Sequence, residues 1–118
     1  MRENPVRRTG GNGRRSSCVT YNNTLYTSGI TTVDLAADIT GQAEDIFSQL
    51  DRLMAFHGTD KSRIITASIF LKDMADYGNF NAVWDAWVSD GEEPARSVVQ
   101  AALPLPEYRL KVALVVAL

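Results

Sequence analysis

The chain has 118 residues, of which 45% are hydrophobic and 22% are charged, and its formal net charge is −2. This length and composition predict one globular domain, and the small net charge argues against a broad nucleic-acid surface. No apolar run reaches the roughly 18 residues of a membrane helix, so no membrane partner is expected. Cys18 is the single cysteine, which excludes an intramolecular disulfide and suits a reducing, cytoplasmic compartment.

Residues 1–13 are polar and rich in arginine and glycine. We expect them to form a flexible arm ahead of a single domain over residues 14–118. No apolar segment follows the arginines, which is unlike a secretory signal. Strands are predicted over residues 17–21 and 24–30. They meet at Asn22-Asn23, because asparagine tolerates the positive φ angles of a tight hairpin turn.

Apolar residues spaced three and four apart predict a helix over residues 40–57, with Gly58 in place for a left-handed cap. The β-branched run over residues 63–71 predicts a strand. A second helix follows, and its tryptophans are interpreted as core or subunit packing. Its apolar stripe consists of Phe80, Val83, Trp84, Trp87 and Val88.

Strands are predicted over residues 94–103 and 109–118, and the second of these alternates cleanly in polarity. The order β-β-α-β-α-β-β predicts an α+β fold with one mixed sheet and two helices on one face. The other sheet face would then be bare and would carry Val98 and Val115. A bare apolar face on a small domain predicts association with further copies.

Arg96 lies near the start of the strand over residues 94–103. A guanidinium keeps its charge and matches a carboxylate or phosphate with two parallel hydrogen bonds, so Arg96 is a candidate anion clamp. The alternative is an exposed arginine at a strand end. Ser28 has no histidine and aspartate partners in the pattern, so a nucleophilic triad is not supported. Cys18 is interpreted as a small buried hydrophobic residue. His57 ends a helix, where a positive charge interacts favourably with the helix dipole.

The chain resembles the YjgF/RidA family, also called the L-PSP endoribonuclease-like or reactive-intermediate deaminase family, over roughly residues 14–118. Three short segments are most similar to its YoaB-like branch. They are Asn22 to Tyr26, Trp84 to Val88 and Val99 to Ala101. The landmarks of the wider family are Thr27-Ser28-Gly29, Ile69 to Asp73, Asn81 to Trp87, Pro94 to Ser97 and Leu105-Pro106.

The resemblance implies a chorismate-mutase-like homotrimer whose ligand sites lie in clefts between subunits. It implies hydrolysis of enamines and imines, released by pyridoxal-phosphate enzymes, to 2-keto acids and ammonia, with no metal or bound cofactor. Arg96 would grip the substrate carboxylate, Ser28 would line the pocket, and Asn81 would lie near the site. The ligand is therefore expected to be a small carboxylate.

Three positions depart from the family pattern. Lys111 stands where the archetypal members have a glutamate that positions water, Arg15 falls near a tyrosine position, and Val98 replaces a cysteine. A neutral Lys111 could act as a base or form a Schiff base. The alternative is a binding module, in which Arg15, Arg96 and Lys111 hold a 2-keto-acid-like anion, a dicarboxylate or a phosphate without turnover. Endoribonuclease or translation-inhibitor activity ranks third, because no histidine pair or metal set is visible.

Overall fold

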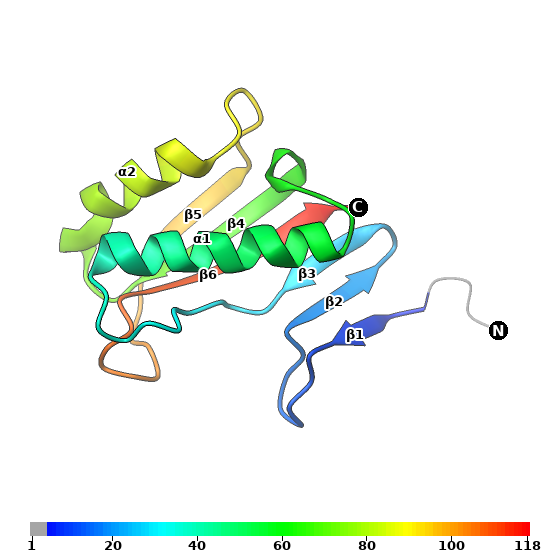
Figure 1. Ribbon diagram of the computed structural model, residues 1–118, viewed down its shortest axis with the longest axis horizontal. Helices are drawn as coiled ribbons and strands as arrows, with labels where there is room; N and C mark the ends of the chain where they lie inside the picture. The colour runs from blue at the N-terminus through cyan, green and yellow to red at the C-terminus, as the bar shows by residue number, and fades with distance from the viewer. Residues whose placement is uncertain (1–4) are drawn as a thin grey trace.

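The structure, a computed structural model, describes residues 5–118. A sheet is covered on one face by two helices (Figure 1). The elements in chain order are β1 (Arg7–Thr9), β2 (Cys18–Tyr21), β3 (Thr24–Thr27), α1 (Ile39–Phe56), β4 (Ile64–Leu71), α2 (Tyr77–Trp87), β5 (Ala95–Gln100) and β6 (Leu110–Ala117), with 3-10 turns at Lys61–Arg63 and Met74–Asp76.

The strands are ordered β1-β2-β3-β6-β4-β5 across the sheet. β4 and β5 run parallel, with α2 as their crossover, and each other neighbouring pair of the described sheet is antiparallel. The predicted mixed sheet with both helices on one face is therefore confirmed. β1 and β5 form the two opposite edges, so residues on these strands lie far apart within one chain.

The N-terminal segment is more regular than its sequence predicts. Residues 7–9, expected in a flexible arm, form β1 and pair with Cys18–Thr20 of β2. A strand can form here because pairing with β2 satisfies backbone hydrogen bonds of residues 7–9, whatever their side chains. A polar strand is also tolerated at a sheet edge. The next turn follows the prediction, since Asn22 and Asn23 have φ angles of 52° and 58°.

Caps fix both ends of α1. The Asp38 carboxylate accepts a hydrogen bond from the backbone N–H of Gly41 at 2.9 Å, and Gly58 follows the helix with a φ of 75°. The helix buries Ile39, Ala43, Ile46 and Leu50 of its predicted apolar stripe, whereas Leu53 and His57 at its end are half-buried. The buried residues of α1 are Ile39, Gln42, Ala43, Ile46, Phe47, Leu50 and Met54.

Aromatic packing joins α1 to α2. The rings of Phe47 and Trp87 are stacked with centroids 4.3 Å apart, and Phe47 also meets Trp84 edge-on at 6.0 Å. Both tryptophans are buried, which confirms their interpretation as core residues. Beneath them, Leu110, Val112, Leu114 and Val116 of β6 are buried on the same face, as the alternation predicts.

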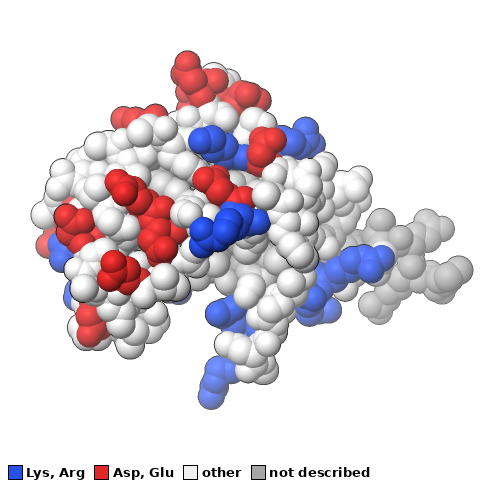
Figure 2. Space-filling model, viewed as in Figure 1, with Lys and Arg blue, Asp and Glu red and all other residues white. Residues whose placement is uncertain are grey.

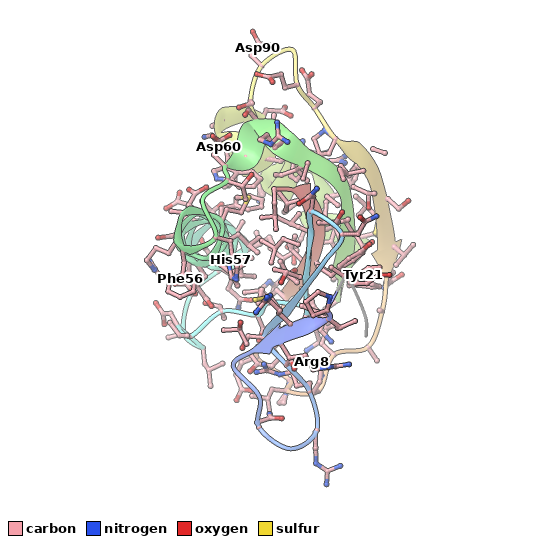
Figure 3. All side chains as sticks on the ribbon, turned by 90° about the vertical axis from the view of Figure 1, so that its right-hand side faces the viewer. Arg8, Tyr21, Phe56, His57, Asp60 and Asp90 are labelled. Carbon is pink, nitrogen blue, oxygen red and sulfur yellow. The ribbon has the colours of Figure 1, made fainter. Side chains whose placement is uncertain are left out.

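The sheet face away from the helices, hereafter the open face, is apolar in part. Figure 3 shows Tyr21 on this side and His57 beside α1 on the other. Tyr26 and Val99 are 43% and 48% exposed. Val98, predicted for this face together with Val115, packs instead against the core, because it pairs with the buried Ile69. The sequence analysis therefore assigned the side chains of β5 to the two sheet faces with an error of one residue.

Candidate functional site

Arg96 extends from β5 over the helix-covered face of the sheet. It lies in register with Ala67 of β4, which in turn pairs with Leu114 of β6, and both of these side chains are buried. Its Nη1 donates to Oδ1 of Asn81 at 2.9 Å, and its guanidinium carbon lies 5.1 Å from the ring centroid of Trp84. The cation is thus fixed against α2 while its side chain stays partly exposed.

Three residues of α2 contact this guanidinium. Besides Asn81 and Trp84, the hydroxyl of Tyr77 lies 3.4 Å from Nη2 of Arg96. The spacings of four and three place Tyr77, Asn81 and Trp84 on one helix face. Sequence analysis identified Asn81 but missed the other two. Their helical spacing from Asn81 could have placed them on its face of the helix. Their contact with Arg96 follows only once α2 is known to pack against β5.

Lys111 lies on the opposite, open face, in the same row as Phe70 and Val99. Its aliphatic stem crosses the backbone of Gly29. A β-carbon added at Gly29 would come within 2.8 Å of Cδ and 2.9 Å of Cγ of Lys111. Glycine, which has no β-carbon, lets the lysine stem lie this close, two residues after β3.

Ser28 and Arg15 lie next to this contact. The Ser28 backbone N–H donates to the Ser17 carbonyl at 2.9 Å, and Arg15 Nη1 donates to Ser17 Oγ at 3.1 Å. Arg15, Ser28 and Gly29 together line a small cavity of about 280 Å³. Ser28 Oγ is buried without a hydrogen-bond partner among the described residues. A buried hydroxyl in this state costs free energy, which a hydrogen-bond partner at this position would recover.

The predicted site residues thus form two groups. Arg96 and Asn81 are in contact on the helix-covered face, with Val98 next to them in the core packing. Arg15 and Ser28 line the cavity at Gly29, and Lys111 packs across Gly29 from the open face. Within one chain the three cations do not converge on one pocket. The roles assigned to these side chains stay predictions.

Cys18 has a histidine partner that the sequence did not indicate. His57 Nε2 lies 3.7 Å from its sulfur, and His57 Nδ1 lies 3.0 Å from the Leu53 carbonyl. Burial raises the pKa of the Cys18 thiol, while a hydrogen bond with Thr9 opposes the shift. A buried thiol with a raised pKa stays protonated, which fits the predicted packing role.

Residues 5–118 hold no cluster of three or more histidine, cysteine, aspartate or glutamate side chains suited to a metal ion. Among the helices of the same range, each is too short or too polar to span a bilayer.

The Endoribonuclease L-PSP family model matches residues 9–118. The chain belongs to this family. The RutC family protein YoaB of Escherichia coli K12 is 40% identical over 104 residues, which are 88% of this chain and 90% of that protein. A RutC family protein of Haemophilus ducreyi is 33% identical over 89% of this chain and 90% of its own.

Solved structures of L-PSP family relatives share this fold. NMB1025 of Neisseria meningitidis, described as a YjgF family member, is 36% identical, with a TM-score of 0.92 over 96% of this chain and 94% of its own. A candidate translation initiation inhibitor from Salmonella typhimurium is 40% identical, with a TM-score of 0.88 over 96% of this chain and 97% of its own. The predicted membership of the YjgF/RidA group is confirmed.

Proposed function

We propose that this L-PSP family protein is a RidA-like deaminase that hydrolyses enamines and imines of small carboxylates to 2-keto acids and ammonia. The observation that carries the proposal is the fixed guanidinium of Arg96, held by Asn81 at 2.9 Å and by the Trp84 ring at 5.1 Å. A planar cation already oriented by its neighbours binds a carboxylate with little loss of side-chain entropy.

The reaction requires the protein to do little more than position the substrate and one water molecule. An enamine first tautomerises to the imine, whose carbon is attacked by water. The C–O bond forms as the C=N pair moves to nitrogen. The carbinolamine then loses ammonia as the C–N bond breaks, which leaves the carbonyl of the 2-keto acid. A protein that grips the carboxylate and orients one water lowers the entropic part of this barrier.

Lys111 supports a second candidate, in which the same site binds 2-keto-acid-like anions without turnover. The archetypal relatives use a glutamate at this position to handle water, and an ammonium group cannot accept a proton. Its stem lies over Gly29, the residue after Ser28, on the open face. A second positive group there strengthens anion binding and weakens the case for a general base.

We further propose that the complete site forms between copies in a chorismate-mutase-like homotrimer. Arg96 is on the edge strand β5, whereas Ser28 and Arg15 lie next to β2 and β3 near the other edge. Four strand spacings separate β2 from β5 and three separate β3 from β5, about 19 Å and about 14 Å. A head-to-tail contact between unlike edges brings the two groups together and closes into a ring. The half-exposed apolar side chains of the open face supply burial for such a contact.

The test is ammonia release from freshly generated 2-aminoacrylate, measured against the uncatalysed rate. The wild-type protein is expected to accelerate release at least tenfold. Arg96→Ala is expected to abolish the acceleration, and Arg52→Ala on the exposed side of α1 serves as a matched control for loss of an arginine. No acceleration by the wild type, together with calorimetric binding of pyruvate that needs Arg96, would establish the second candidate and refute the first.

A further inference from the structure

A cleft of about 500 Å³, within the range of small-molecule sites, lies between α1 and α2. We call it the interhelical cleft. Most of its lining residues are exposed, so it opens on the outer side of the helix layer, opposite the open face that the proposed homotrimer would bury. Tyr77, Asn81 and Trp84, which contact Arg96, do not line it. The interhelical cleft is therefore separate from the proposed deaminase site.

The two walls of the interhelical cleft differ in polarity. The wall on α1 is polar and contains Glu44, Ser48 and Asp51, at helical spacings of four and three. The wall on α2 is apolar and contains Ala82, Val83 and Ala86. Such a cleft is suited to an amphipathic ligand, with its charged groups toward α1 and an aliphatic part against α2.

Trp87 holds two opposite charges in this cleft. Its Nε1 donates to both carboxylate oxygens of Asp51 at 3.1 Å. The Nζ atom of Lys61 lies 5.6 Å from the centroid of the Trp87 ring, at a distance typical of a cation over an aromatic ring. The turn that carries Lys61 is itself capped, since the Asp60 carboxylate accepts a hydrogen bond from the Ser62 N–H at 2.9 Å. A carboxylate and an ammonium group are thus positioned by the same indole.

Asp51 and Lys61 are nevertheless not paired with each other. The one ion pair within residues 5–118 involves neither of them. Arg52, the neighbour of Asp51 in the chain, donates instead to the Ser48 hydroxyl at 2.7 Å. Two opposite charges that are fixed near one ring but out of contact can be bridged by a molecule that carries both an ammonium and a carboxylate.

The charge of the surrounding surface selects further among ligands. Figure 2 shows the acidic side chains gathered over the helices and the basic ones over the N-terminal segment. Residues 34–93, which include both helices, contain twelve acidic and four basic side chains. This surface disfavours a ligand of net negative charge, whereas Lys61 inside the cleft disfavours a simple cation. A neutral zwitterion meets neither penalty.

We propose that the interhelical cleft binds a free aliphatic α-amino acid. Its ammonium group lies on Asp51, its carboxylate on Lys61, and its side chain against the apolar wall of α2. An amino acid carries both charges next to an aliphatic body, which matches the polar and apolar walls together. The proposal goes beyond deamination, because it concerns binding outside the proposed deaminase site.

The experiment is an NMR titration of the nitrogen-15-labelled full chain with L-leucine. It is read at the indole N–H signal of Trp87, which the Trp87→Phe variant identifies. Leucine is expected to shift this signal, with a dissociation constant of about 1 mM or below. The comparison probes are isopentylamine, which lacks the carboxylate, and 4-methylpentanoate, which lacks the ammonium group. Both are expected to bind at least fivefold more weakly than leucine.

Charge variants test the two ends of the ligand separately. Asp51→Asn keeps an oxygen acceptor for Trp87 and removes only the charge, so it is expected to weaken leucine binding at least fivefold. Lys61→Gln is expected to weaken leucine binding equally without weakening isopentylamine. The matched controls Asp90→Asn and Arg14→Gln each remove one charge at an exposed position outside the cleft, and each is expected to change leucine affinity less than twofold.

A steric variant tests the cleft without a change of charge. Ala86→Leu places a larger side chain at an exposed helix position of the apolar wall and is expected to abolish leucine binding. Thermal melts of each variant separate lost binding from lost folding.

Three results would overturn the proposal. The first is a folded wild type whose Trp87 signal does not respond to leucine, or equal losses in the charge variants and their controls. The second is equal affinity for isopentylamine and leucine, which would indicate a simple cation site. The third is a loss of leucine binding in Arg96→Ala without a loss in Asp51→Asn, which would place leucine at Arg96 instead.

Discussion

Arg96 on β5 and Asn81 on α2 are joined side chain to side chain, with Nη1 2.9 Å from Oδ1. The contact fixes one nitrogen of the guanidinium fork and leaves the rest of its donors for other partners. Because Asn81 is an uncharged acceptor, it orients the cation without neutralising it. An anion that reaches Arg96 therefore meets a full positive charge in a set direction.

Removing this contact should loosen the clamp with little effect on the fold. Asn81→Ala is expected to weaken pyruvate binding about fivefold, which corresponds to about 1 kcal/mol for one lost hydrogen bond. Isothermal titration calorimetry measures this change. Asn79→Ala, two residues earlier on an exposed part of α2, is the control and should leave the affinity unchanged. Equal affinities for all three proteins would show that Asn81 does not position Arg96.

The packing of Lys111 across Gly29 predicts a coupled pair. Gly29→Ala is expected to destabilise the protein by about 1–2 kcal/mol, because the new methyl group overlaps the lysine stem. In a Lys111→Ala background the same substitution should cost much less. Urea unfolding of the four proteins gives the coupling free energy directly. An additive result would mean that the two residues are not in contact.

Elements with strong local signals were predicted well from the sequence. The double-asparagine turn, the cap at Gly58 and the alternation of Leu110 to Val116 each depend on a short stretch of chain, and the structure agrees with all three. β1 was missed because its pairing with β2, and not its own residues, makes it a strand. Val98 was placed on the wrong face because Val98 and Val99 are both apolar. Their polarity therefore does not show which of the two faces the core.

The site was predicted only in part, for a related reason. The family pattern identifies Arg96, Ser28 and Asn81, but it says nothing of which sheet face each side chain occupies. The separation of Arg96 from Lys111 follows from the registers of β5 and β6 on β4. Tyr77, which also reaches Arg96, could be found only once the contact between α2 and β5 was known.

An ion pair between the buried Asp76 and the partly exposed Arg109 should anchor the segment that leads into β6. Arg109 contacts Asp76 through two hydrogen bonds of 2.9 and 3.1 Å, and the Asp76 carboxylate raises the pKa of the guanidinium. Asp76→Ala is expected to destabilise the protein by about 2 kcal/mol, since Asp76 is buried and Arg109 is partly solvated. Asp85→Ala, an exposed position on α2, is the control in urea unfolding. Equal midpoints for the two variants would contradict this role.

The loop between β3 and α1 should give the protein a defined acid sensitivity. The pKa of Asp45 is lowered, because burial, which would raise it, is outweighed by hydrogen bonds from the Val33 amide, the Thr32 hydroxyl and the Gln49 side chain. A depressed folded pKa contributes stability above the unfolded value of about 3.9, and this contribution is lost as the pH falls through the folded pKa.

Asp45→Asn is therefore expected to lose about 1–2 kcal/mol of stability at pH 7. The difference from the wild type should shrink below about pH 4, where the wild-type carboxylate is protonated as well. Thermal melts from pH 3 to pH 7 measure both trends. A gap between the two proteins that stays constant over this range would contradict the assignment.

A crystal structure with a bound 2-keto acid tests the central claim most directly. We predict that the carboxylate of pyruvate lies against the guanidinium of Arg96 in one copy, within contact distance of Ser28 and Lys111 of the partner subunit. An Arg96 side chain that faces solvent with no neighbouring copy at β5, and a ligand bound elsewhere or not at all, would contradict the account.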